Sequence, residues 1–320
     1  MTKGYIALVL HAHLPYVHHP QEKNLLEERW LFEAITETYL PLIKVFEKLT
    51  NENVHFRITL SLSPTLISML ASPLLQERYL KHIETLKVLA DKEVERTKSQ
   101  PDFNYVSRMY REILYDAYNN FLNTYDCNLL NAFKKFEEQG KLELITSSAT
   151  HGFLPLLNIH NSAVKAQLKI GADTFAKEFG HYPKGMWLPE CGYYHGLENE
   201  LAALGVSYFF VDSHGLLFAE PRVKYGTLAP IRSASGVAAF ARDHESSKQV
   251  WSSSEGYPGD FDYREYYRDI GYDLDYEYIK PYVHPSGIRV NTGFKYHRVT
   301  GKSEWKECYQ PDWARQKAAL

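Results

Sequence analysis

The chain has 320 residues, 44% of them apolar, which is enough for one large α/β barrel or two smaller domains with a sizeable core. Its formal net charge of −3 excludes the basic excess that nucleic-acid binding needs. Aromatic residues make up 14%, including 24 tyrosines. Tyr and Trp combine an apolar face with a polar edge, so this enrichment suits either sugar rings or an ordinary tyrosine-rich core and surface.

The cysteines and the first apolar run bear on location. Cys127, Cys191 and Cys308 are widely spaced and match no zinc or disulfide pattern, which favours a reducing compartment. The run at residues 5–10 is too short for a signal peptide or a membrane span. We therefore expect a cytoplasmic protein with no membrane or nucleic-acid partner, and its oligomeric state stays open.

Short apolar runs alternate with helical patterns in the first two thirds of the chain. Strands are predicted at residues 5–10, 54–62, 142–146, 185–188 and 206–211, with a further candidate at 291–296. Runs that are apolar on both faces are typical of a parallel sheet covered by helices. A polar residue follows every one of the first five runs. The alternation predicts right-handed crossovers and an α/β fold that closes plausibly into a barrel.

The connecting segments differ in character. Residues 25–49 show helical spacing and predict one helix, or two with a break near Pro41. Residues 72–139 are charged and helical, which predicts a helical insertion between two barrel strands. Residues 220–310 are rich in Gly and Tyr and predict a long loop-rich segment of the same domain, which spans residues 1–310. A further helix begins at about residue 311 and reaches the last residue, 320.

Glu190 is the strongest candidate for chemistry. It follows the predicted strand at 185–188 and is flanked by Trp187 and Tyr193. A carboxylate held between aromatic rings can attack the anomeric carbon of a bound sugar. The structural alternative is a glutamate that complements the positive end of a helix dipole.

Histidines follow several of the predicted strands. His11 and His13 are two residues apart and point to one side if the strand continues, and His151 and His214 follow later strands. A metal site would need three such ligands, but the sequence has no local pair such as HExxH. The alternatives are structural histidines or hydrogen bonds to sugar hydroxyls, and we predict no metal and no cofactor.

Three further residues have two interpretations each. Asp212 follows an apolar run and would either orient a neighbour or act as a second carboxylate. Trp30 and Trp251 would either pack in the core or surface, or form platforms for sugar rings.

Four motifs together resemble glycoside hydrolase family 57, and within it the 1,4-α-glucan branching enzymes. They are His11-Ala-His-Leu-Pro-Tyr16, Gly140-Lys-Leu-Glu-Leu-Ile-Thr146 with Thr150-His-Gly-Phe-Leu-Pro155, Trp187-Leu-Pro-Glu-Cys-Gly-Tyr193, and Trp251-Ser-Ser-Ser-Glu-Gly-Tyr-Pro-Gly-Asp260. Their order and spacing match as well, over essentially the whole chain. The resemblance implies an incomplete (β/α)7 barrel, a distorted form of the TIM barrel.

The resemblance also implies roles for the candidate residues. Glu190 would be the nucleophile of a retaining double displacement, which needs a second carboxyl about 5–5.5 Å away. His11, His13 and His151 would line the donor sugar site, and Trp30 and Trp251 would be platforms in the groove. The substrate would be an α-1,4-glucan such as amylose or a glycogen-like polysaccharide, on which the enzyme forms α-1,6 branches.

One family motif is missing. The family's acid/base is an Asp in an Asp-x-Glu-Leu-Phe-Gly-His-like motif, which occurs nowhere in these 320 residues. We therefore expect residues 311–320 to begin a truncated C-terminal helical region, and little transglycosylation by this chain alone. The alternatives are an α-amylase or 4-α-glucanotransferase of the same family, a non-catalytic glucan-binding protein, and a metal-dependent carbohydrate deacetylase.

Overall fold

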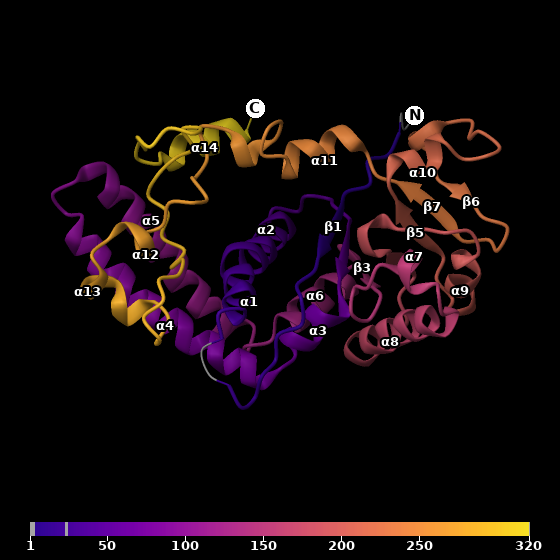
Figure 1. The fold of residues 1–320 in the computed structure, drawn as a ribbon, viewed down its shortest axis with the longest axis horizontal. Coiled ribbons are helices and arrows are strands. Elements are labelled where there is room, and N and C mark those ends of the chain that lie inside the picture. Colours follow the sequence, from indigo (N-terminus) through magenta and orange to yellow (C-terminus); the bar gives the residue numbers. More distant parts are fainter. Residues whose placement is uncertain (1–3, 23–24, 320) are drawn as a thin grey trace. The chain divides into compact units, whose positions relative to one another are not determined.

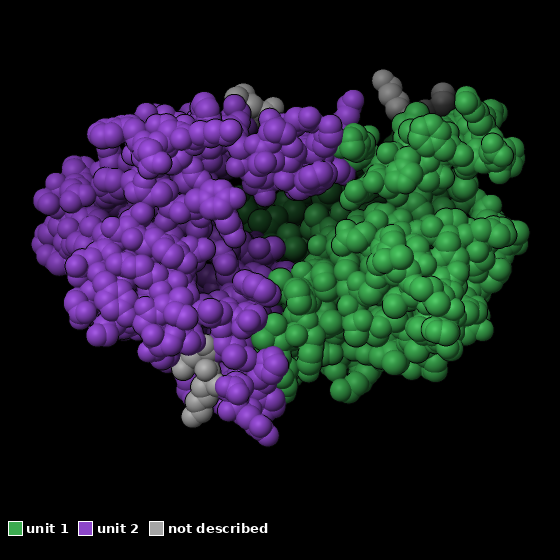
Figure 2. All heavy atoms as spheres, viewed as in Figure 1, with its two compact units in different colours: residues 1–18, 42–75, 128–244 green, residues 19–41, 76–127, 245–320 purple. Residues whose placement is uncertain are grey.

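A computed structural model describes residues 4–22 and 25–319, which form two compact units (Figure 2). Unit 1 comprises residues 1–18, 42–75 and 128–244, and unit 2 comprises residues 19–41, 76–127 and 245–320. Both units are therefore built from segments that are distant in the sequence. Each unit is described by itself below.

Unit 1 is built on a seven-stranded sheet in the order β1-β2-β3-β4-β5-β7-β6 (Figure 1). Every neighbouring pair is parallel except β6 and β7, and the two edge strands β1 and β6 do not pair with each other, so the sheet stays open. This arrangement confirms the predicted α/β class and the incomplete (β/α)7 barrel. The strands are β1 (Val9–Ala12), β2 (Ile58–Leu62), β3 (Leu142–Ser147), β4 (Gly185–Trp187), β5 (Tyr208–Val211), β6 (Ile231–Arg232) and β7 (Ala238–Ala241).

Helices connect these strands and close the core of unit 1. The interior between β4, β5 and their helices is apolar, with Leu168, Met186 and Leu201 fully buried. Burial of such side chains supplies about 1.5–3 kcal/mol each, which is what holds the layers together. The helices are α2 (Leu40–Asn51), α3 (Pro64–Leu70), α6 (Leu129–Glu138), α7 (Leu154–Leu157), α8 (Asn161–Phe179), α9 (Leu197–Ala203) and α10 (Ser213–Leu217).

The first strand begins later than predicted. Residues 5–10 were expected to form it, but β1 starts at Val9, and Tyr5 and Ile6 are 94% and 99% exposed. The reason is pairing, because β1 has β2 as its one neighbour and its first paired residue, Val9, lies opposite Thr59. Leu8 still accepts from the Thr59 N–H through its backbone oxygen, but Tyr5 and Ile6 precede the first residue of β2 in this register.

The strands after residue 219 differ from the prediction, because one expected strand is absent and β6 and β7 were not predicted. The expected strand at 291–296 does not form, because the N–H groups of Thr292 and Gly293 donate to the Asp269 carboxylate instead of to a neighbouring strand. Conversely, β7 was missed, since Ala238 and its alanine neighbours have low strand propensity. Pairing with β5 along the whole of β7 forms the strand nonetheless.

Unit 2 is largely helical. The expected helix at 25–49 is continuous from residue 28 to 51, with a π-helical turn just before Pro41, whose missing N–H and bulky ring disfavour regular α-helix there. Residues 72–139 form helices without a strand, as predicted. The unit contains α1 (Glu28–Ala34), π turns at Ile35–Tyr39 and Asn120–Thr124, most of α4 (Pro73–Arg96), α5 (Pro101–Asn119), α11 (His244–Trp251) from its second residue, α12 (Ile270–Asp273), α13 (Tyr276–Ile279) and α14 (Pro311–Ala318).

A buried carboxylate anchors the loop-rich segment to α4. Glu93 is fully buried and accepts hydrogen bonds from Arg96, from Tyr278 Oη at 2.7 Å and from Tyr296 Oη at 2.8 Å. A buried charge is stable when it is paired and fully hydrogen-bonded. The predicted helix at the end of the chain appears as α14, and residue 320 lies outside the described residues. Among the described helices, none is long and apolar enough to cross a membrane.

Gly171 on α8 is required by close packing against the end of β3. A Cβ at this position would lie 2.4 Å from the backbone oxygen of Ser147. We expect Gly171→Ala to lower the free energy of unfolding by about 1–3 kcal/mol, because α8 must move away from the strand. Urea unfolding measures this change.

The sign is informative, because Gly→Ala inside a helix ordinarily stabilises by up to about 1 kcal/mol. Gly215 on α10 serves as the control, since a Cβ there would meet only ordinary contacts at 3.4 Å. Gly215→Ala should leave stability unchanged or raise it. A neutral Gly171→Ala variant would contradict the packing argument.

Candidate active site

Polar side chains gather at the carboxyl ends of β1 to β4. The strand register places His11 opposite Ser61 and Ser147 opposite Trp187. Residues two apart on a strand face the same side, so His13 follows His11 on that face. In parallel sheets the functional groups collect at this end of the strands, which is where sequence analysis expected them.

Each of the three histidines is held by a serine hydroxyl through its Nδ1 atom. The Nδ1–Oγ distance is 3.0 Å for His11 with Ser61, for His13 with Ser63, and for His151 with Ser147. Ser63 is also the N-cap of α3. Because Nδ1 is engaged in all three rings, Nε2 is the nitrogen left to meet a ligand.

The rings form one stack on Trp187. His11 lies over the indole with ring centroids 4.4 Å apart and an interplanar angle of 10°. His151 lies 5.1 Å from His11 and 3.9 Å from His13, with the planes within about 20° of parallel. Trp187 therefore supports a histidine on one face. The other candidate aromatic, Tyr193, stacks on Phe209 and donates from Oη to Glu198 at 2.8 Å.

Burial keeps these histidines neutral. Burial, together with the neighbouring His151 and His13, lowers the pKa of His11 from 6.5 to about 3. Burial and the neighbouring His13 lower the pKa of His151 to about 4. Burial also lowers the pKa of His13, and the negative charge of Glu190 opposes that shift.

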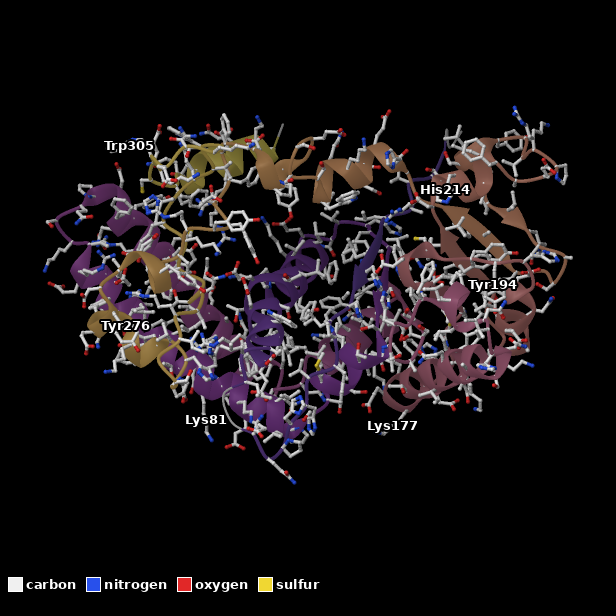
Figure 3. All side chains as sticks on the ribbon, viewed as in Figure 1. Lys81, Lys177, Tyr194, His214, Tyr276 and Trp305 are labelled. Atoms are coloured by element: carbon white, nitrogen blue, oxygen red, sulfur yellow. The ribbon has the colours of Figure 1, made fainter. Side chains whose placement is uncertain are left out.

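Within residues 4–22 and 25–319, no three His, Cys, Asp or Glu side chains are arranged to hold a metal ion. His214, the fourth candidate ligand, is labelled in Figure 3, and its side chain is 73% exposed and lies 3.9 Å from Asp212. It is not part of the stack.

Glu190 lies in a tight turn after β4. Its backbone is left-handed, with φ at 52°, and Cys191 follows at φ 54°. His151 shares this conformation, with φ at 57°. Non-glycine residues at positive φ cost of order 1–3 kcal/mol each and cluster at functional sites. The Glu190 side chain is exposed, so the turn presents a carboxylate at the surface of unit 1.

Next to the turn, Gly192 leaves room for a phenyl ring. A Cβ at this position would lie 2.3 Å from the Phe153 ring, so any other residue would require the ring to shift. Phe153 comes two residues after His151 in the chain. The contact therefore ties the turn that carries Glu190 to the loop that carries a histidine of the stack.

Asp212 and Arg242 form an ion pair beside this turn. The guanidinium of Arg242, directly after β7, donates to Asp212 at 3.3 and 3.4 Å. Burial alone would raise the pKa of Asp212, but the Arg242 hydrogen bonds, the Ser213 N–H and nearby positive charge bring it below its ordinary value. Asp212 is therefore held ionised, which suits a positioning role and not that of a proton donor.

Arg242 is one of the site residues that the sequence did not predict, and the three serines that hold the histidines are the others. Burial would lower its pKa, but the hydrogen bond to Asp212 and the negative charges of Asp212 and Glu190 raise it. The available signal was the apolar Ala238-Ala-Phe-Ala241 run followed by a charged residue, the same pattern that singled out Asp212. The two tryptophans predicted as platforms, Trp30 and Trp251, belong to unit 2 and are 52% and 62% exposed.

The family model for glycosyl hydrolase family 57 matches residues 7–319. The chain belongs to glycoside hydrolase family 57. Among curated family members, it is 33% identical to a 1,4-alpha-glucan branching enzyme of Thermococcus kodakarensis over 98% of this chain and 47% of the relative. It is 30% identical to a probable 1,4-alpha-glucan branching enzyme of Mycobacterium tuberculosis over 97% of this chain and 56% of the relative. The chain thus spans about half the length of these relatives.

Two solved structures share the fold of this chain. The alpha-amylase AmyC from Thermotoga maritima superposes with a TM-score of 0.94 at 52% identity, covering 99% of this chain and 61% of that one. A branching enzyme from Pyrococcus horikoshii superposes with a TM-score of 0.82 at 33% identity, covering 99% of this chain and 57% of that one. The incomplete barrel of unit 1 is thus a family 57 feature.

The lowered histidine pKa values predict that the protein becomes less stable as the pH falls. Unfolded histidines bind protons near 6.5, whereas His11 and His151 in the folded protein do so only near 3 and 4. The unfolded state then carries more protons over that window, so the free energy of unfolding decreases as pH falls from about 7 towards 4. Urea unfolding at about pH 7.5 and about pH 5 measures the loss.

Removing one of these buried, neutral imidazole rings should reduce the loss of stability at low pH. We expect a smaller difference between the two pH values for His11→Gln than for the parent protein. His55→Gln, which changes an exposed histidine of unit 1, should keep the parent difference. An equal loss in His11→Gln and the parent would contradict the assigned pKa direction.

Proposed function

We propose that this chain acts on α-1,4-glucans through Glu190 as the nucleophile of a retaining double displacement. The observation that carries the proposal is the exposed carboxylate of Glu190 on a strained turn, next to a stack of neutral histidines. Neutral rings leave the carboxylate without a protonated partner at neutral pH, so it is free to attack carbon. The free Nε2 atoms of the rings supply hydrogen-bonding groups for sugar hydroxyls.

In the first step a Glu190 oxygen forms a bond to the anomeric carbon, and the bond from that carbon to the glycosidic oxygen breaks. The leaving oxygen takes a proton from a second carboxyl group. In the second step an acceptor hydroxyl gives its proton to that carboxylate, its oxygen bonds to the anomeric carbon, and the bond to Glu190 breaks, with net retention. Asp212 does not fit the acid role, because Arg242 holds it ionised. By resemblance, the acid belongs to the family motif that these 320 residues lack.

The molecule that accepts the sugar from Glu190 determines whether the enzyme branches or hydrolyses the glucan. A 6-hydroxyl of another glucan gives an α-1,6 branch, and we propose branching because the curated relatives at 33% and 30% identity are named as branching enzymes. Water as the acceptor gives hydrolysis. That second candidate is supported by the 52% identity to the Thermotoga maritima structure, which is named as an alpha-amylase.

The nucleophile can be tested without an acid catalyst. α-Maltosyl fluoride needs no protonation of its leaving group, so we expect fluoride release and a covalent maltosyl adduct whose mass maps to the peptide containing Glu190. Glu190→Gln should reduce fluoride release by roughly three orders of magnitude or more and abolish the adduct. Intact-protein and peptide mass spectrometry measure the adduct.

Glu138→Gln is the matched control, because Glu138 is an exposed glutamate on α6 of unit 1. It should release fluoride at the parent rate. An adduct on any other residue, or fluoride release that survives Glu190→Gln, would overturn the assignment of Glu190.

The two acceptors are separated by products. Because these 320 residues lack the family's acid motif, α-maltosyl fluoride is the donor and amylose is the acceptor. The product is analysed for new α-1,6 linkages by debranching and for free reducing maltose. We expect debranching to release maltose while little free maltose forms. Free maltose without new α-1,6 linkages would instead establish hydrolysis.

A further inference from the structure

The serine hydroxyls beside the histidine stack do more than hold the rings. Each hydroxyl has one proton and two lone pairs, so its partners fix which histidine nitrogen carries a proton. The hydrogen bonds of Ser147, Ser63 and Ser61 can each be accounted for in this way.

Ser147 decides the proton position on His151. Its Oγ donates to the backbone oxygen of Trp187 at 2.8 Å, because a carbonyl can only accept. The single hydroxyl proton is therefore used. The 3.0 Å contact with His151 Nδ1 must then be an N–H donating to Oγ. His151 carries its proton on Nδ1, and its Nε2 is an acceptor.

Ser63 and Thr65 decide the proton position on His13. Thr65 Oγ1 donates to the Leu14 backbone oxygen at 2.7 Å, so at its 3.0 Å contact with Ser63 Oγ it accepts. Ser63 has thereby used its proton and accepts from the Leu66 N–H at 3.4 Å.

The remaining lone pair of Ser63 Oγ accepts from His13 Nδ1 at 3.0 Å. Thr65 Oγ1 is a more distant neighbour of that nitrogen, at 3.5 Å. His13 therefore also carries its proton on Nδ1, and its Nε2 is an acceptor like that of His151.

Ser61 leads to the opposite result for His11. This side chain is fully buried, and the hydrogen bond that the described residues provide for its Oγ is the 3.0 Å contact with His11 Nδ1. A buried hydroxyl proton without an acceptor is costly. Ser61 therefore donates to His11 Nδ1, and His11 carries its own proton on Nε2.

Resting on the function proposed above, we infer that Ser61, Ser63 and Ser147 are positioning residues that set a mixed hydrogen-bonding pattern for the sugar. His11 Nε2 donates to a sugar oxygen, and His13 and His151 Nε2 accept from sugar hydroxyl protons. The described hydrogen bonds of the three rings are made through Nδ1, and the Nε2 atoms are not among the fully buried polar atoms without a partner, which are Ser148 Oγ, Tyr194 Oη and His297 Nδ1. Tyr194 is labelled in Figure 3.

Nitrogen-15 NMR of histidine-labelled protein at about neutral pH tests this without a substrate. We expect His13 and His151 to show a protonated Nδ1 and an unprotonated Nε2, and His11 to show the reverse. Resonances are assigned by single His→Gln variants. A protonated Nε2 on His151 or His13 in the parent protein would overturn the inference, whether or not the protein acts on glucans.

Ser147→Ala and Ser148→Ala form a matched pair. Both serines are fully buried neighbours, but Ser148 Oγ has no hydrogen-bond partner in the described chain. We expect Ser147→Ala to move the His151 proton to a mixture of the two nitrogens. Ser148→Ala should leave all three rings as in the parent. A His151 ring unchanged by Ser147→Ala would contradict the role of Ser147.

Binding of sugar analogues tests the same hydrogen-bonding pattern of the three histidines. Fluorine in place of a hydroxyl accepts weakly but cannot donate, so it should be tolerated opposite His11 and rejected opposite His13 and His151. Competition with singly deoxygenated and singly fluorinated maltose measures this. In Ser147→Ala the fluorine penalty at one position should fall. Penalties identical in the parent and in Ser147→Ala would overturn the specificity role and leave the glucan activity assay unaffected.

Discussion

Parallel pairing of β1, β2, β3 and β4 is the constraint on which the site depends. The register sets His11 opposite Ser61 and Ser147 opposite Trp187, and the two-residue strand period brings His13 onto the same face. A slip of one residue would turn these side chains to the other face of the sheet. The apolar core beneath β4 and β5 buries Met186 of β4 with Phe209 and Val211 of β5, so packing favours one register for these two strands.

The stacked histidines of the site carry almost no positive charge at neutral pH. Burial makes protonation of the stacked rings unfavourable, and the Arg242 guanidinium is paired with Asp212. Glu190 is therefore an exposed carboxylate next to neutral histidines, and the nearby Arg242 guanidinium is already paired with Asp212. Such an environment suits attack on an electrophilic carbon, whereas a protonated histidine in contact would stabilise the carboxylate and weaken it as a nucleophile.

Sequence patterns predicted the α/β class, the long helical stretch and the residues at the strand ends, because period and apolar runs report directly on burial. These patterns gave the wrong result where a neighbouring strand determines whether a segment forms a strand. The start of β1 depends on where β2 begins, and β7 forms from alanines because β5 lies beside it. The candidate Glu190 followed from its place after an apolar run. The sequence did not single out the serines, because nothing local distinguishes Ser147 from Ser148. The strand register places Ser147, and not Ser148, beside a histidine.

The left-handed backbone of Glu190 has a consequence for how this position tolerates change. Glycine adopts that conformation freely, whereas a glutamate there is strained. The side chain is exposed, so its removal leaves no cavity. Glycine would therefore suit the backbone better and remove the carboxylate, so that stability and chemistry favour different residues at the same position. On the function proposed above, the glutamate at this position serves activity at a cost in stability.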